Sequence, residues 1–201
     1  FLGSQKHIFT KQSLSGFHLY DKMTMATQEH VRREFGNVEE NELRLDKEKS
    51  EQVINALNQD LADTYTLYHQ VKKHHWNVEG AEFRDLHLFL GDAAGHAEEA
   101  ADELAERAQA LGGTPISSGK AQEEHASVEP EGQDVYDIRT SLENDLEMYG
   151  DIIESLRDHI DLAENLGDHA TAQILREIIV QTEEDAHHIE HYLEDDTLVL
   201  D

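Results

Sequence analysis

Apolar residues recur at intervals of three and four along most of the chain, a period that predicts long amphipathic α-helices. Four segments carry this pattern. We expect helices at about 47–77, 83–111, 134–166 and 169–193, with glycine in each of the three breaks between them. The pattern therefore predicts an all-α protein.

The lengths of the connections predict how these helices are arranged. Short turns join the first helix to the second and the third to the fourth, so each pair should form an antiparallel hairpin. The middle connection, about 112–133, is long enough to cross the bundle, and its residues 120–126 favour a short helix. The second and third helices can then run parallel. This is a ferritin-like four-helix bundle with one long crossover.

The ends of the chain differ from this bundle, which we place at 46–194. Residues 1–45 form an N-terminal extension, partly mobile, whose first 22 residues carry several lysines and one acid and are either a leader or an addition. Residues 195–201 form an acidic tail. No apolar run approaches the roughly 18 residues of a membrane span. With no cysteine, the chain fits a soluble protein of the reducing cytoplasm.

The charge of the chain is extreme. It has 44 acidic residues against 16 lysines and arginines, a formal net charge of −28. The acids are interleaved with helical apolar positions, so they predict a solvated acidic surface that repels itself at low salt. A salt-rich cytoplasm that screens the repulsion, or a protein that handles cations, would explain such a surface. The two explanations are compatible.

One face of the second helix carries candidate metal ligands at both ends. We name this set the glycine stripe, and it consists of His87, Gly91, Gly95, Glu98, Asp102 and Glu106. Its histidine and aspartate lie about 22 Å apart along a helix, too far to hold one ion. Two antiparallel copies across a two-fold axis would bring each histidine end to the acidic end of its partner, with the glycines allowing close approach.

His75 ends the apolar face of the first helix, where a histidine is more often a hydrogen-bonded core residue than a ligand. The short turn at Gly80 changes that balance, because it brings His75 beside His87. Two histidines and two carboxylates form a mixed nitrogen and oxygen site that suits iron or zinc. Trp76, next to this site, is interpreted as an interface aromatic on packing grounds.

Glu184-x-x-His187 matches a second metal-binding element, the Glu-x-x-His of di-iron bundles. Such a site inside one subunit needs another copy, and no other histidine has a glutamate three positions before it. We therefore expect the segment from Glu184 to His191 to be a surface cluster or a secondary cation site.

Two motifs resemble the Dps family of miniferritins, the DNA-binding proteins from starved cells. They are His74-His75-Trp76-Asn77-Val78-x-Gly80-x-x-Phe83-x-x-Leu86-His87 and Asp102-x-x-Ala105-Glu106-Arg107. The similarity extends over the four helices, and the charge resembles that of an acidic, haloarchaeal type of member. It implies a homo-dodecameric shell with tetrahedral symmetry and a ferroxidase centre at each two-fold interface.

Carried over by position, the resemblance assigns His75, His87, Asp102 and Glu106 as catalytic iron ligands, with Glu106 bridging. Trp76 matches the aromatic that is thought to intercept oxidising equivalents in the family. One departure is Gly91, where the family usually has an acid. Asp92 is adjacent but lies about 100° away around the helix, so the second iron position is weak, filled by water, or served by another acid.

The resemblance also implies a route for iron. Glu164, Asp168 and His169 align with an acidic uptake pore, although N-capping of the fourth helix would explain them equally. A last set of acids is a candidate for mineral nucleation, although a solvated outer face would also explain it: Glu98, Glu99 and Glu103.

The implied function is that of an iron-storage ferroxidase, which oxidises Fe(II) with peroxide in preference to dioxygen. Two alternatives stay open: a shell that compacts the nucleoid by binding DNA, and a passive cation buffer without redox turnover. The acidic surface makes DNA binding unfavourable, because phosphate contacts need basic residues. Only the basic residues 1–22 favour it.

Overall fold

A computed structural model describes residues 30–194 of the chain. The described residues from Gly36 onward form one compact unit, which contains all of the helices described below. These are α2 (Lys47–Asn77), α3 (Phe83–Ala110), α4 (Gly119–His125), α5 (Ile138–Leu166) and α6 (His169–Leu193). None of the described helices could span a membrane. The features expected of residues 1–22 and 195–201 lie outside the described residues.

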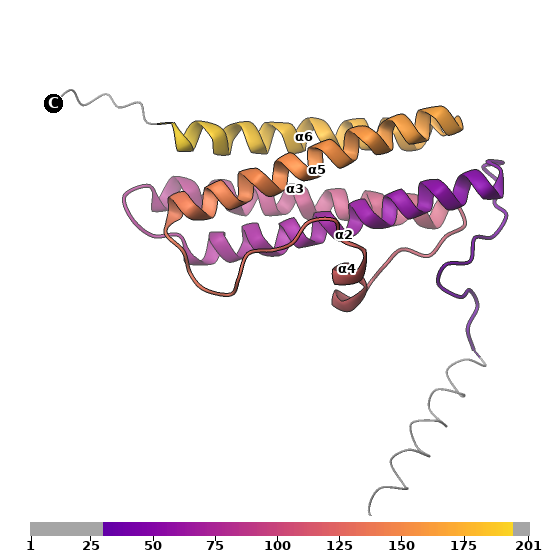
Figure 1. Ribbon diagram of the computed structural model, residues 1–201, viewed down its shortest axis with the longest axis horizontal. Coiled ribbons are helices and arrows are strands. Elements are labelled where there is room, and N and C mark those ends of the chain that lie inside the picture. Colours follow the sequence, from indigo (N-terminus) through magenta and orange to yellow (C-terminus); the bar gives the residue numbers. More distant parts are fainter. Residues whose placement is uncertain (1–29, 195–201) are drawn as a thin grey trace, which may run out of the picture. The chain divides into compact units, whose positions relative to one another are not determined.

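The four long helices form the predicted bundle. In Figure 1, α2 and α6 run in one direction and α3 and α5 run in the other, so α3 and α5 are parallel. α2 packs against α3, α5 packs against α6, and the two hairpins meet along α2 and α5. The crossover, residues 111–137, carries α4 past α2. The all-α fold with one long crossover and a short helix inside it is confirmed.

The start of the third long helix differs from the sequence prediction. The apolar period favours a start near 134, but α5 begins at Ile138. Asp137 caps it: its carboxylate accepts hydrogen bonds from the Thr140 amide at 3.1 Å and from the Thr140 hydroxyl at 2.8 Å. An N-cap residue itself has non-helical backbone angles, so the helix cannot extend through it. At the other end Gly167 takes the left-handed conformation, φ +82°, which closes the helix where the sequence predicts.

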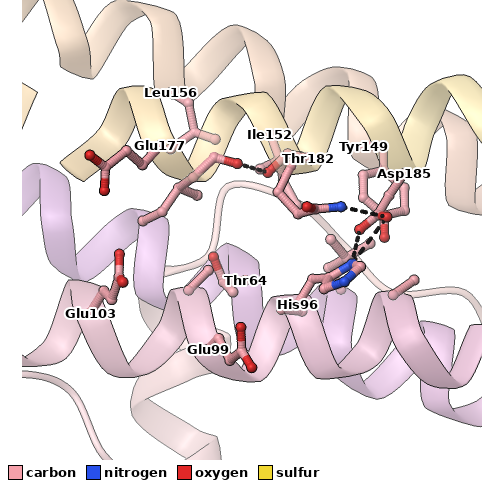
Figure 2. Close-up of a pocket in the computed structure, with 16 residues that line it drawn as sticks. Thr64, His96, Glu99, Glu103, Tyr149, Ile152, Leu156, Glu177, Thr182 and Asp185 are labelled. Carbon is pink, nitrogen blue, oxygen red and sulfur yellow. Dashed lines mark hydrogen bonds and ion pairs between the residues drawn. The ribbon is translucent and has the colours of Figure 1, made fainter. Parts of the chain in front are cut away.

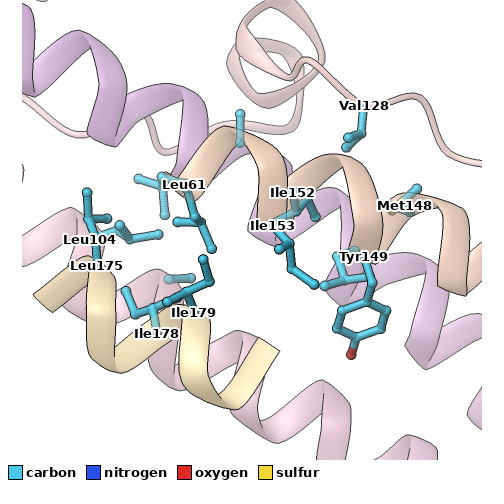
Figure 3. Close-up of a cluster of buried hydrophobic side chains, with 14 of the residues drawn as sticks. Leu61, Leu104, Val128, Met148, Tyr149, Ile152, Ile153, Leu175, Ile178 and Ile179 are labelled. Atoms are coloured by element: carbon cyan, nitrogen blue, oxygen red, sulfur yellow. The ribbon is translucent and has the colours of Figure 1, made fainter. Parts of the chain in front are cut away.

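The core fills the space between the hairpins with leucine and isoleucine from all four long helices. Leu61, Leu104 and Leu175 meet near one end, and Ile152 and Tyr149 lie further along (Figure 3). These positions follow the three-and-four spacing of the sequence, because residues at that spacing lie on one face of a helix.

Buried polar side chains of α2 hold the crossover in place. Asn58 accepts a hydrogen bond from the Ile116 amide at 3.0 Å. Asp63 accepts bonds from the amides of Ser127 and Val128, at 2.6 and 3.2 Å. A loop packed on a helix must find partners for its amides, since a buried amide without one costs about 1–3 kcal/mol. These side chains therefore fix the path of a segment that has little regular structure of its own.

His74, near the end of α2, is the last of these buried polar side chains. Its two ring nitrogens lie 2.7 Å from Asp145 and 2.7 Å from Glu131, a residue of the crossover. Burial alone would lower the pKa of His74, but the hydrogen bonds and charges of the two carboxylates outweigh it and raise that pKa. His159 is similar, since Asp60 at 2.8 Å raises its pKa against the effect of burial.

These two histidines predict how stability depends on pH. A histidine with a raised pKa in the folded state stabilises fully below its unfolded value of about 6.5, and the contribution is lost as pH rises through the folded value. We therefore expect the free energy of unfolding to decrease from about pH 6.5 into the alkaline range. The double variant His74→Gln/His159→Gln should flatten that slope in denaturant titrations at fixed salt and protein concentration. His69→Gln, at an exposed position, is the matched control and should keep the wild-type slope. An unchanged slope in the double variant would contradict this account.

Candidate metal centre

His75 and His87 lie together, as the short turn between α2 and α3 predicts. Their rings stack with centroids 3.9 Å apart and planes 18° apart. Nδ1 of His75 donates to the His87 carbonyl oxygen at 2.7 Å, and Nδ1 of His87 donates to the His75 carbonyl oxygen at 2.9 Å. This reciprocal pair of hydrogen bonds ties the end of one helix to the start of the next.

These bonds determine the tautomer of both rings. A carbonyl oxygen only accepts hydrogen bonds, so each Nδ1 must carry the proton. In a neutral ring the lone pair is then on Nε2, which makes no hydrogen bond to the backbone. A histidine that ligates a metal is commonly held this way, with its second nitrogen fixed by a carbonyl or carboxylate. Both rings are therefore oriented to bind a metal through Nε2.

The surface around the histidine pair is apolar and open. Phe83 stacks on His87, with ring centroids 5.2 Å apart. The exposed fractions of Phe83, Leu88 and Trp76 are 47, 51 and 69%. Exposed large apolar side chains such as these are typical of an interaction surface.

The candidate carboxylates lie at the far end of α3. Asp102 and Glu106 are both exposed, and the helix is unbroken between them and His87. The two ends are thus about 22 Å apart. Within residues 30–194 of one chain, no three histidine, aspartate or glutamate side chains come together as a metal site. One chain presents a histidine pair at one end of α3 and an acid pair at the other.

The two glycines between these ends have different surroundings. A Cβ at Gly91 would lie 3.1 Å from Cε1 of His75, so this glycine makes room for the His75 ring. A Cβ at Gly95 would meet nothing of its own chain within 4 Å. Glycine inside a helix costs about 1 kcal/mol relative to alanine. Gly91 therefore makes room for the His75 ring, besides the expected close approach of two helices. Among residues 30–194, no contact accounts for Gly95. The neighbouring Asp92 is exposed.

The three residues aligned with an uptake pore have different environments. Asp168 is buried, caps α6 through the Thr171 amide at 3.1 Å, and pairs with Arg107 at 2.6 Å. Asp168 therefore caps α6, which is the alternative role that the sequence left open. Glu164 pairs with Arg176 at 2.9 Å, and that hydrogen bond keeps the pKa of the carboxyl below its usual value. His169 lies 3.6 Å from Glu164 and is largely exposed.

The three nucleation candidates also differ in where they lie. Glu99 and Glu103 line a cavity of about 190 Å³ between α3 and α6, together with Glu177 (Figure 2). Glu98 does not line it and belongs to the glycine stripe. All three are exposed.

The same cavity contains an interaction that the sequence gives no sign of. Nδ1 of His96 lies 3.0 Å from Asp185, which also accepts from Gln181 at 3.2 Å (Figure 2). Burial raises the pKa of Asp185, and His96 partly opposes that effect. The buried Tyr149 hydroxyl has no hydrogen-bond partner. His96 and Asp185 are 89 positions apart, so only the packing of α6 on α3 pairs them.

Comparisons with known proteins agree with this architecture. The family model of the ferritin-like domain matches residues 54–199. The "DNA protection during starvation protein" of Halobacterium salinarum is 65% identical over 176 residues, covering 87% of this chain and 97% of that protein. The "nutrient stress-induced DNA-binding protein" of a Nostoc species is 38% identical over 176 residues, covering 88% and 96%.

Solved structures give the same result. The crystal structure of an archaeal Dps homologue from Halobacterium salinarum superposes with a TM-score of 0.83 at 65% identity, covering 87% of this chain and 97% of that one. Dps from Vibrio cholerae, described as a member of a broad superfamily of ferritin-like diiron-carboxylate proteins, has a TM-score of 0.73 at 28% identity and covers 77% and 96%.

The pairing of Asp185 predicts a stability effect. Asp185→Ala leaves Gln181 and His96 without their partner, and we expect a loss of about 1–3 kcal/mol in the free energy of unfolding. Asp185→Asn keeps one acceptor oxygen and should cost less. Glu177→Gln, an exposed change in the same cavity, is the control and should stay within about 0.5 kcal/mol of wild type. Chemical denaturation measures all three, and equal stability of Asp185→Ala and Glu177→Gln would contradict the assignment.

Proposed function

The chain belongs to the Dps group of ferritin-like proteins, and from that premise we propose that it is a ferroxidase that stores iron. Fe(II) is its substrate, and ferric mineral inside a closed shell of twelve copies is the product. The observation that carries the proposal is the division of ligands on α3. His75, at the end of α2, and His87 are pre-oriented beside one end of α3, whereas Asp102 lies about 22 Å along α3 and Glu106 one turn beyond it.

Two copies of α3 crossing antiparallel on a two-fold axis would complete two identical sites. Each would receive His75 and His87 from one subunit and Asp102 and Glu106 from the other. The exposed apolar side chains beside the histidines supply surface for such a contact. The absence of a side chain at Gly95, which its own chain does not explain, would allow the two helix backbones to approach.

The ligand types fit the oxidation of iron. Imidazole nitrogen binds Fe(II), and the anionic oxygens of Asp102 and Glu106 favour the more highly charged Fe(III), which lowers the cost of losing an electron. Two Fe(II) ions each give one electron to one peroxide, whose O–O bond breaks to form two waters with two protons. Trp76, which follows His75 in the sequence, would intercept oxidising equivalents. The product then hydrolyses to ferric mineral.

The remaining acids would guide the ions. Glu164 and His169, at the surface near the start of α6, would line the uptake pore, while the buried Asp168 would hold that corner together through Arg107. Glu99 and Glu103 share a cavity with Glu177 and would bind ferric ions at the start of mineral growth.

The relatives are named for DNA, and the charge of this chain bears on how such a role would be achieved. A surface with 44 acids against 16 lysines and arginines repels phosphate. We therefore propose that the chain protects DNA by consuming Fe(II) and peroxide rather than by coating the duplex.

The shared site can be tested by mixing two defective subunits. One carries His75→Ala and His87→Ala, and the other carries Asp102→Asn and Glu106→Gln. Shells of either kind alone should oxidise Fe(II) slowly, because every site lacks half of its ligands. Free mixing makes about half of the dimers mixed, and each mixed dimer restores one of its two sites, so about one quarter of all sites recover.

The measurement is the initial rate of Fe(II) oxidation against mixing ratio, with peroxide consumption followed in parallel. The rate should be highest near equal proportions. A rate that stays at the baseline, with mixed dimers verified by mass, would exclude the shared site. Fe(II) uptake without peroxide consumption would instead identify a passive cation buffer.

DNA binding provides a separate test. We expect no retardation of duplex DNA on a gel at physiological or higher salt, because few basic residues oppose many acids. If retardation occurs, deletion of residues 1–22, which carry Lys6, Lys11 and Lys22, should abolish it. Retardation that survives this deletion would contradict the proposed mode of protection.

A further inference from the structure

A second pair of histidines lies on the surface of α6, apart from the candidate ferroxidase residues. His187 and His191 are one helical turn apart, and their Nε2 atoms are separated by 3.1 Å. Their ring centroids are 4.3 Å apart with planes at 73°. Residues four positions apart lie on the same face of a helix, so the two rings are neighbours on the surface of α6.

The separation of the two Nε2 atoms matches that of two ligands on one metal ion. Imidazole nitrogen binds transition metals at about 2.0–2.1 Å. Two such ligands are about 2.9 Å apart at the right angle of an octahedral site and about 3.4 Å apart in a tetrahedral one. The observed 3.1 Å lies between these values. In the free protein one Nε2 donates a hydrogen bond to the other, and an ion bound between them would replace that proton.

A carboxylate next to the pair favours the ligand tautomer of His187. Glu190 lies 3.7 Å from Nδ1 of His187, so it attracts the proton to Nδ1 and leaves the lone pair on Nε2. Glu184 lies instead beside Nε2 of the third histidine of this turn, His188, at 3.5 Å. His187, His191 and Glu190 are exposed, so an ion in water reaches them freely.

The backbone of this turn is anchored to α3. Phe89 of α3 contacts the ring of His188 edge-on, with centroids 5.6 Å apart, and the ring of Tyr192 at 5.7 Å. These contacts fix the helical turn that carries both chelating residues. The cost of ordering the site is then limited to two side chains, which favours binding.

We propose that His187 and His191 form a separate binding site for a divalent transition metal, with water in the remaining positions. Two protein ligands give an exchangeable site rather than a permanent structural one. Imidazole ligands favour Cu²⁺ and Zn²⁺ over Fe²⁺, so the site selects ions other than the proposed substrate. The bound ion links two successive turns near the end of α6. None of its ligands belongs to the candidate ferroxidase site.

Zinc titration of the assembled full-length protein, after removal of metal with a chelator, tests this site. All variants are made in a His75→Ala/His87→Ala background, so that the other histidine pair does not contribute. The background protein should bind Zn²⁺ at the α6 pair. His187→Ala or His191→Ala should each weaken that binding by about 100-fold, the advantage that a second linked ligand provides. His69→Ala, an exposed histidine of α2, is the control and should retain it. Equal zinc binding by the background and all three variants would overturn the proposal.

A second measurement separates this site from the proposed function. In an otherwise wild-type chain, His191→Ala should oxidise Fe(II) at the wild-type rate. Loss of that rate would place the α6 pair on the iron route and overturn a separate site. If the wild-type chain itself fails to oxidise Fe(II), the ferroxidase proposal fails, whereas the zinc titration still decides the α6 pair.

Discussion

The rise of 1.5 Å per residue in an unbroken α3 is the constraint on which the candidate centre depends. It separates His87 from Asp102 by about 22 Å and from Glu106 by about 28 Å, distances that no rotamer change can close. The histidine end is nevertheless well ordered, because His75 and His87 each hold the other through a backbone carbonyl. One chain therefore orients the two candidate histidine ligands and holds the two candidate carboxylates out of their reach. This arrangement suits a site that is shared with a second copy.

Buried polar contacts elsewhere support this geometry. His74, directly before His75, is held between Asp145 and Glu131, so the last turn of α2 is fixed to both α5 and the crossover. Buried charges cost free energy unless they are paired and hydrogen-bonded, and here both ring nitrogens have a carboxylate partner. The polar network that defines the path of the crossover thus also positions a candidate ligand.

The acidic surface links the proposed storage function to the charge of the chain. Under the proposed function, acids that are solvated in one subunit, such as Glu99 and Glu103 of the cavity lining, would provide carboxylates for ferric ions. A large negative charge concentrates cations near the protein and repels phosphate, and salt screens both effects. The histidine pairs differ from this background, because imidazole selects transition metals over the alkali cations that a carboxylate surface attracts.

The sequence alone determined the helices and their order, because helical period and connection length are local properties. It also predicted that His75 and His87 meet, since one short turn joins them. It missed the start of α5, where the cap at Asp137 overrides the apolar period, and the role of Gly91 beside the His75 ring. Only the tertiary structure paired His96 with Asp185 and set the 3.1 Å between His187 and His191. The first depends on how α6 packs against α3 and the second on side-chain rotamers, and neither is encoded in the spacing of residues along the chain.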